Sequence, residues 1–314
     1  MIHFAHVAYR LAERFSLRET GIEHFQTWSP ESTRKEIGKG HIIVLSGLWE
    51  SDMLPLCTNR PFIQVCAAGY NQFDLNAIRD SGIRLANCSG VNKNAVSEHA
   101  MALMLSFTRL LHTTRDYQKL HEWRGLISQI DQREDELGGK TLLILGLGTI
   151  GSRLASLAKA FGMHVIGIKR DATQHNHVSD EVYSNNELIQ HLPRADFVVL
   201  TCPLTNETTN IINSDTLSAM SPTSYLINVA RGGCVDQTAL IRALKKKHIA
   251  GAGIDTTVNE PLDRKSPLWD LENVILTPHT AGETRCYEDN VIDILLQNVH
   301  RLWSGREDLI NQII

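Results

Sequence analysis

The chain has 314 residues, a formal net charge of −4 at pH 7 and 42% hydrophobic residues. This length favours two domains over one, and the composition is typical of a globular protein. The small net charge gives no sign of a nucleic-acid or anionic-membrane partner, and no apolar run reaches membrane-spanning length. The N-terminus lacks a signal-peptide core, and the six cysteines show no metal-ligand spacing. We therefore expect a cytoplasmic protein with reduced cysteines and no bound metal.

Residues 1–94 have the pattern of a small α/β unit. The apolar runs His41–Leu45, Phe62–Cys66 and Ile83–Ala86 predict strands, and Asp74–Ser81 predicts a helix.

A small glycine-containing loop, Ala67–Asn71, follows one of these predicted strands. Its backbone N–H groups could hold a carboxylate, which makes Ala68 and Gly69 candidate substrate contacts. A plain turn is an equally good interpretation of the same residues.

The next segment has the longest helical periodicity in the chain. Apolar residues recur at helical spacing from Val96 to Leu111, which predicts one helix over Ala95–His121. Asn94 fits as its N-cap, and Glu98 would lie in the first turn, where the helix dipole favours an acid. The charged segment Asp131–Lys140 then forms a connection.

The stretch Thr141–Arg170 predicts a strand–helix–strand unit around a glycine motif. Leu142–Leu145 and Val165–Ile168 are buried-strand patterns, and Gly146-x-Gly148-x-x-Gly151 lies between the first strand and the helix. Gly146 permits a tight turn, Gly148 lets the backbone approach a pyrophosphate, and Gly151 allows close packing of helix and strand. A glycine-rich turn without a ligand is the alternative, but the flanking elements favour a dinucleotide site.

Strands and helices alternate through the rest of this half, which predicts a doubly wound parallel sheet. Asp171–Asn186 is predicted as a loop. The expected strands are Phe197–Thr201, Tyr225–Val229, Gly251–Asp255 and Val274–Leu276, and the expected helices are Glu187–His191 and Gln237–Lys247. Ligands bind beyond the carboxyl ends of strands in such sheets. Ionisable residues lie there: Arg231, Asp255, Glu260 and His279.

These residues belong to motifs that resemble one protein family. The motifs are Asn228–Gly233 (NVARGG), Asp255 with Glu260-Pro261-Leu262, Pro278–Gly282 (PHTAG), Gly90-Val91-Asn92 and Glu98-His99-Ala100. Together with the glycine loop they resemble the D-isomer-specific 2-hydroxyacid dehydrogenases, of the glyoxylate/hydroxypyruvate reductase kind. The resemblance covers the chain from about Val65 onward.

The resemblance implies a Rossmann nucleotide domain inserted in a smaller, flavodoxin-like α/β substrate domain. The expected boundaries are 1–94 for the first part of the substrate domain, 95–281 for the dinucleotide-binding domain and 282–314 for the C-terminal return. It also implies a homodimer formed across the Ala95–His121 arm.

The resemblance also implies catalytic roles. Arg231 would grip the substrate carboxylate and polarise the carbonyl oxygen, and His279 would donate the proton to that oxygen. Glu260 would hydrogen-bond the far nitrogen of His279 and fix its tautomer. A salt-bridging arginine, a structural histidine and an exposed helix-start glutamate are the alternatives for the three residues.

Asp255 is expected to contact the nicotinamide amide, although a strand-end aspartate can also cap a turn. Further cofactor contacts are implied at positions of the glycine motif and three later loops: Gly146, Gly148, Thr149, Ile150, Gly151, Cys202, Pro203, Thr208, Val229, Ala230 and Gly282.

Lys169 and Arg170 stand where an NAD site usually has an acid for the ribose hydroxyls. Two cations favour a 2′-phosphate, so we expect NADP(H) to be preferred and NAD(H) to remain possible. Solvated loop charges are the alternative interpretation.

The expected activity is reduction of a 2-oxo acid to a D-2-hydroxy acid. The alternative is a nucleotide-sensing regulatory protein, as in the corepressor branch that the same motifs resemble.

Overall fold

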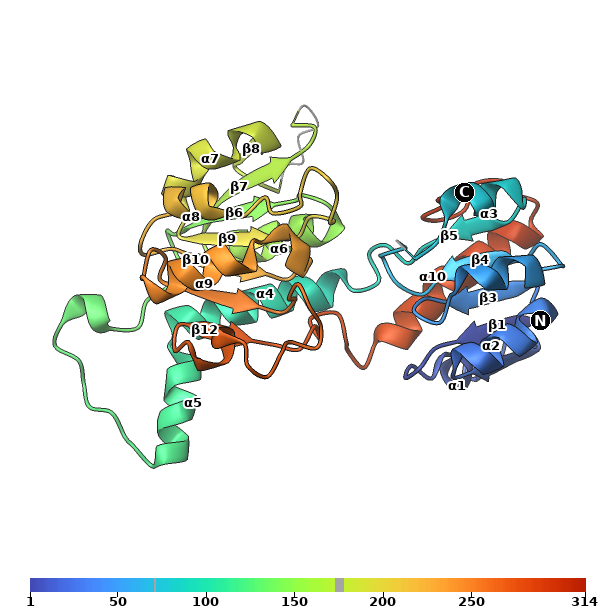
Figure 1. The fold of residues 1–314 in the computed structure, drawn as a ribbon, viewed down its shortest axis with the longest axis horizontal. Coiled ribbons are helices and arrows are strands. Elements are labelled where there is room, and N and C mark those ends of the chain that lie inside the picture. The colour runs from blue at the N-terminus through green and yellow to red at the C-terminus, as the bar shows by residue number, and fades with distance from the viewer. Residues whose placement is uncertain (71, 173–177) are drawn as a thin grey trace. The chain divides into compact units, whose positions relative to one another are not determined.

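The computed structural model describes residues 1–70, 72–172 and 178–314 (Figure 1). It divides into two compact units. The first contains Met1–Asn92 and Glu283–Ile314, and the second contains Lys93–Gly282. Asn71 of the candidate carboxylate loop and part of the predicted loop Asp171–Asn186 lie outside the described residues.

The first unit is a parallel sheet of five strands in the order β2-β1-β3-β4-β5, which is the flavodoxin-like order. Its elements are β1 (Ile2–Ala5), α1 (Leu11–Ser16), β2 (His24–Thr27), α2 (Pro30–Glu36), β3 (Ile42–Leu45), β4 (Phe62–Val65), α3 (Leu75–Asp80), β5 (Arg84–Ala86) and α10 (Tyr287–Trp303). Helix α10 returns to this unit because Val291, Leu295 and Val299 pack against the same core as Ile2 and Phe4.

The second unit is a parallel sheet of seven strands in the order β8-β7-β6-β9-β10-β11-β12. Its strands are β6 (Thr141–Leu145), β7 (His164–Lys169), β8 (Glu181–Ser184), β9 (Phe197–Leu200), β10 (Tyr225–Asn228), β11 (Gly251–Ile254) and β12 (Val274–Leu276). Its helices are α4 (Lys93–Thr108), α5 (Leu111–Leu120), α6 (Thr149–Ala160), α7 (Leu188–His191), α8 (Ser214–Ala219) and α9 (Gln237–Lys245).

Helices cover both faces of this sheet. Residues of α4 and α6 share one core with the sheet, and residues of α7, α8 and α9 share the core on the other face. The strand order reverses between β6 and β9, and such a switch point is where doubly wound folds bind ligands. The predicted fold class is therefore confirmed.

The single helix expected over Ala95–His121 is wrong. Helix α4 ends at Thr108, and α5 starts at Leu111 after Leu110 adopts a left-handed φ of 49°. The carbonyl of Thr108 accepts the N–H of Asp135 at 2.7 Å rather than an N–H of the following turn, and the left-handed Leu110 ends the helical path. Asn94 is also not an N-cap, because α4 already includes Lys93.

Two other expectations need correction. The predicted loop Asp171–Asn186 contains β8, an edge strand whose four residues are all half-buried. Because a half-buried strand does not need a continuous apolar sequence, the pattern used to predict strands is absent there. Helix α10, with 17 residues, is longer than α4, with 16, although only the α4 region was expected to be a long helix.

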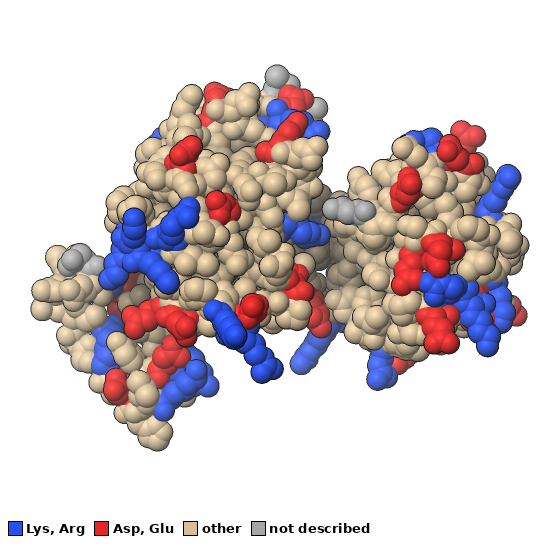
Figure 2. All heavy atoms as spheres, in the orientation of Figure 1, with Lys and Arg blue, Asp and Glu red and all other residues tan. Residues whose placement is uncertain are grey.

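Among the described residues, no helix is both long and apolar enough to cross a membrane. Basic and acidic side chains are interspersed on the face of the molecule seen in Figure 2, and neither sign covers either unit on that face.

Candidate active site

The centre of the candidate site is an ion-pair-like contact between His279 and Glu260. His279 follows β12, Glu260 follows β11, and His279 Nδ1 lies 2.7 Å from Glu260 Oε2. The other carboxylate oxygen accepts the backbone N–H of Thr257 at 3.0 Å, which orients the carboxylate. Because an ionised carboxylate only accepts hydrogen bonds, Nδ1 carries the hydrogen in this contact, and Nε2 is the ring nitrogen that remains for a substrate. No hydrogen bond from another described residue reaches Nε2.

The loop that carries His279 has an uncommon backbone conformation. His279 has a φ of 56°, in the left-handed region, which costs a non-glycine residue about 1–2 kcal/mol. Its N–H donates to the carbonyl of Asp255 at 2.8 Å. The Asp255 carboxylate accepts the N–H groups of Thr280, at 3.0 Å, and Ala281, at 3.1 Å. Asp255 is 2% exposed and thus holds the loop on both sides of His279.

Arg231 lies in the loop after β10, next to the loop of Glu260. The buried Asn228 side chain shapes this loop by donating to the Arg231 carbonyl and accepting the Ala230 N–H, each at 3.1 Å. A Cβ on Gly232 would come within 2.0 Å of the Thr257 carbonyl carbon, so only glycine allows the two loops to touch. The exposed Arg231 guanidinium hydrogen-bonds its own neighbour, the Ala230 carbonyl, at 2.8 Å.

The glycine motif begins helix α6 at the switch point. Gly146 has a φ of 106°, and a Cβ there would lie 2.7 Å from the Cys202 nitrogen. A Cβ on Gly151 would meet the Gly146 carbonyl oxygen at 2.1 Å. By contrast, a Cβ on Gly148 would have no neighbour within 4 Å. The backbone at Gly148 is therefore open to a ligand at the N-terminus of α6, which fits a pyrophosphate.

The loop after β9 borders this glycine motif. The hydroxyl of Thr208 donates to the Pro203 carbonyl at 2.6 Å and accepts the Thr205 N–H at 2.8 Å, so it shapes the loop. A hydrogen bond with Cys234 and burial both raise the pKa of the Cys202 thiol, which therefore stays neutral. Val229 and Ala230 follow the adjacent strand β10, and both are buried.

The basic pair at the end of β7 has an acidic neighbour. Arg170 exposes 76% of its side chain, and its Nε lies 3.7 Å from Glu207 Oε2. Lys169 is the last residue of β7 and is half-buried.

The proposed carboxylate loop belongs to the first unit. The Ala68 carbonyl accepts the Asn87 side-chain N–H at 2.7 Å, and both Ala68 and Gly69 are half-buried.

Comparison with known proteins decides the family. Residues 101–281 match the model of the D-isomer specific 2-hydroxyacid dehydrogenase, NAD binding domain. The chain belongs to the D-isomer specific 2-hydroxyacid dehydrogenase family.

Relatives span most of this dehydrogenase. Glyoxylate/hydroxypyruvate reductase B of Pectobacterium carotovorum is 34% identical over 81% of this chain and 82% of its own length. Glyoxylate reductase of Pyrococcus furiosus is 34% identical over 77% of this chain and 73% of its own. A solved structure of a family protein from Aeromonas salmonicida has a TM-score of 0.86 and 28% identity, covering 99% of this chain and 98% of that one.

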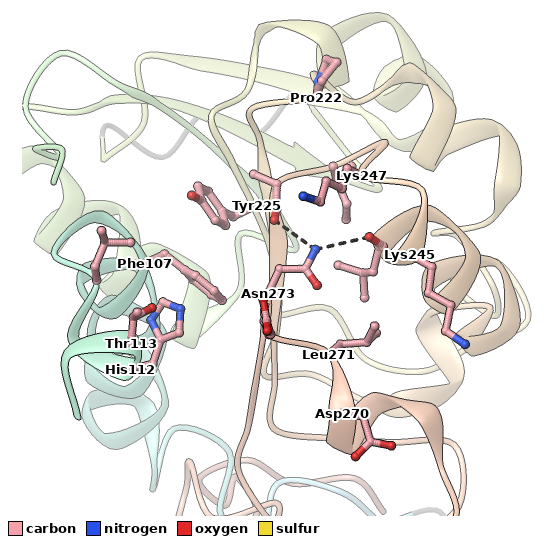
Figure 3. Close-up of a pocket in the computed structure, with 15 residues that line it drawn as sticks. Phe107, His112, Thr113, Pro222, Tyr225, Lys245, Lys247, Asp270, Leu271 and Asn273 are labelled. Atoms are coloured by element: carbon pink, nitrogen blue, oxygen red, sulfur yellow. Dashed lines mark hydrogen bonds between the residues drawn. The ribbon is translucent and has the colours of Figure 1, made fainter. Parts of the chain in front are cut away.

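A separate hollow of about 680 Å³ lies at the amino-terminal ends of strands in the second unit, opposite the ends that carry the candidate site (Figure 3). It lies at the starts of β10, β11 and β12, where Tyr225, Ala250 and Asn273 line it. The Asn273 amide donates to the Leu244 and Ala250 carbonyls at 3.4 and 3.2 Å. His279 follows the other end of β12, so this hollow is not part of the candidate site.

Four residues of the site were not singled out from the sequence. Thr257 orients Glu260, Glu207 faces Arg170, and Thr277 and His99 contact Asp255. His99 had a signal, since it lies in the Glu98-His99-Ala100 motif. The other three have no pattern that distinguishes them from ordinary loop residues.

Proposed function

We propose that this dehydrogenase reduces a 2-oxo acid to a D-2-hydroxy acid, with NADPH as its preferred hydride donor. The observation that carries the proposal is the 2.7 Å contact between His279 and Glu260, in a chain of this family. The pair supplies a proton donor whose orientation is fixed, which the reduction of a carbonyl requires.

His279 acts as the general acid in the proposed reaction. A bound nicotinamide would supply the hydride that reduces the carbonyl carbon. The Nε2–H of the imidazolium gives its proton to the carbonyl oxygen, where negative charge develops. Glu260 holds Nδ1–H at 2.7 Å and stabilises the positive charge of the ring before the transfer.

Arg231 anchors the substrate in this proposal. Its guanidinium turns from the Ala230 carbonyl to the substrate carboxylate, which it can bind through two parallel hydrogen bonds. The backbone N–H groups around Ala68 and Gly69, in the first unit, are proposed as substrate contacts. That unit is the proposed substrate domain.

The glycine motif and its neighbouring loops are proposed to hold the cofactor. The open backbone at Gly148, with Thr149 and Ile150 in the first turn of α6, would bind the pyrophosphate. Cys202, Pro203, Thr208, Val229, Ala230 and Gly282 are proposed to line the rest of the site. Asp255 Oδ2 accepts only the Ala281 N–H from the described residues, which leaves capacity for the nicotinamide amide.

Lys169 and Arg170 support the preference for NADPH. Lys169 ends the strand after the glycine motif and Arg170 follows it, where an acid would accept hydrogen bonds from the ribose of NAD. Solved structures of this fold at 23% and 22% identity contain NADPH and NAD respectively, so the fold itself does not select the cofactor.

A homodimer is the proposed assembly. Helix α5 has no buried residue and, with the segment after it, stands away from the sheet of the second unit (Figure 1). Trp123, Leu126 and Ile130 in that segment are 99%, 104% and 80% exposed. Apolar side chains exposed to this degree mark a protein contact, which a second copy would supply.

A substrate panel tests the proposed function. NADPH oxidation is followed with glyoxylate and hydroxypyruvate, which the names of the relatives suggest, and with larger 2-oxo acids. At least one substrate should give a D-2-hydroxy acid. Absence of turnover with every 2-oxo acid, while NADPH still binds, would contradict the proposal.

A further inference from the structure

A hydrogen-bond relay links helix α4 to the loop of His279. The Thr277 hydroxyl lies 3.0 Å from His99 Nε2 and 2.6 Å from Asp255 Oδ1. His99 Nε2 itself is 3.7 Å from the same carboxylate oxygen. The relay is sheltered, because the side chains of His99 and Asp255 are 23% and 1% exposed.

The chemistry of the three groups fixes the direction of the relay. An ionised carboxylate has no hydrogen to donate, so the Thr277 hydroxyl donates to Asp255. The hydroxyl has a single hydrogen, and its oxygen therefore accepts from the Nε2–H of His99. Each donor has one acceptor, and Thr277 can hold only one orientation.

Asp255 transmits this orientation to His279. Its carboxylate accepts the N–H groups of Thr280 and Ala281, and its carbonyl accepts the N–H of His279. These bonds surround a residue whose left-handed φ of 56° is unfavourable for histidine. Without the Thr277 hydroxyl, the buried Asp255 carboxylate loses its shortest hydrogen bond, and the carboxylate that binds the His279 loop is held less firmly.

The relay also joins the two ends of the second unit. His99 lies in the second turn of α4, which begins that unit at Lys93. The loop Thr277–Gly282 ends it.

We propose that Thr277 and His99 are positioning residues for proton transfer. Through Asp255 they hold the His279 backbone in the conformation that directs its imidazole to Glu260. This inference rests on the proposed function, in which His279 is the proton donor.

The substitution Thr277→Val tests the inference because it removes the hydroxyl and keeps the shape. Misplacement of a reacting group by about 1 Å can cost about 10²-fold, so we expect kcat to fall about 10- to 100-fold. The KM of the 2-oxo acid should change less than about threefold, since its proposed anchor Arg231 is untouched. Thr277→Ser should restore kcat, and His99→Leu should lower it in the same way.

Thr108→Val is the matched control. Its hydroxyl is also buried, but its partners among the described residues are the Met104 and Leu105 carbonyls of its own helix. It should leave kcat unchanged.

A double-substitution cycle separates the two proposals. If Thr277 acts through His279, Thr277→Val should cause no further loss in the His279→Ala background. Wild-type kcat in Thr277→Val, with His279→Ala inactive, would overturn the relay and leave the proposed function standing. Normal activity of His279→Ala would overturn the assignment of His279 as the proton donor, whereas absence of turnover with every 2-oxo acid would overturn the proposed function itself. If Thr277→Val does not fold, His99→Leu decides: a lower kcat at unchanged KM supports the relay, and an unchanged kcat overturns it.

Discussion

Exchanging the charges at the end of β7 should reverse the cofactor preference. The double substitution Lys169→Asp and Arg170→Ala removes two cations and introduces the acid that an NAD site usually has. A charge-assisted hydrogen bond is worth about 1.5–3 kcal/mol. Arg170 exposes 76% of its side chain and faces Glu207, so we count a single bond at the low end. That corresponds to a wild-type preference for NADPH of at least about tenfold in kcat/KM.

The assay compares kcat/KM for NADPH and NADH at a saturating concentration of one 2-oxo acid. The double variant should lose activity with NADPH and keep or improve its activity with NADH. Glu207→Gln gives an opposite perturbation, because removing a negative charge near the 2′-phosphate relieves repulsion of about 1 kcal/mol and should raise the preference about fivefold. Glu272→Gln, at the opposite edge of the sheet, is the control and should change nothing. Equal wild-type kcat/KM values for the two cofactors would refute the reasoning.

Three further predictions concern other parts of the molecule. Arg231→Lys keeps the charge but loses the bidentate geometry, so steady-state kinetics should show a higher KM for the 2-oxo acid and a lower kcat; wild-type values would remove Arg231 from the substrate site. Burial lowers the pKa of His3 from 6.5 to about 4, so its neutral form stabilises the fold above pH 6.5. About 3 kcal/mol of that stability is lost as the pH falls from 6.5 to 4, and urea unfolding should show less acid sensitivity in His3→Gln than in the wild type; equal sensitivity would argue against it. Trp123→Ser with Leu126→Ser should turn the proposed dimer into a monomer in light scattering, and a wild-type monomer at micromolar concentration would contradict the proposed assembly.

Local sequence patterns predicted most of the strands that are buried on both faces, but not β1, whose four residues are also buried. The strands β6 and β7 and the helix between them follow from continuous apolar runs and glycine spacing. The half-exposed edge strand β8 has no such pattern. The break between α4 and α5 coincides with the left-handed Leu110 and with a bond from the Asp135 N–H to the Thr108 carbonyl, a tertiary contact that helical periodicity does not encode.

The candidate site divides in the same way. The order of the motifs predicted that His279, Glu260 and Arg231 follow strand ends, and the structure brings His279 and Glu260 into contact. The support of the His279 loop could not be predicted, because it depends on backbone N–H groups that reach the Asp255 carboxylate only in a left-handed turn. The contact of Glu207 with Arg170 could not be predicted either, because it depends on the path of the loop after β9.

The most direct test of the central claim is single-turnover reduction of a 2-oxo acid by NADPH in the wild type and in His279→Ala. General acid catalysis contributes about 10²–10⁴-fold, so the variant should bind NADPH normally and reduce the substrate slower by that factor. An unchanged rate of reduction in His279→Ala would contradict the account.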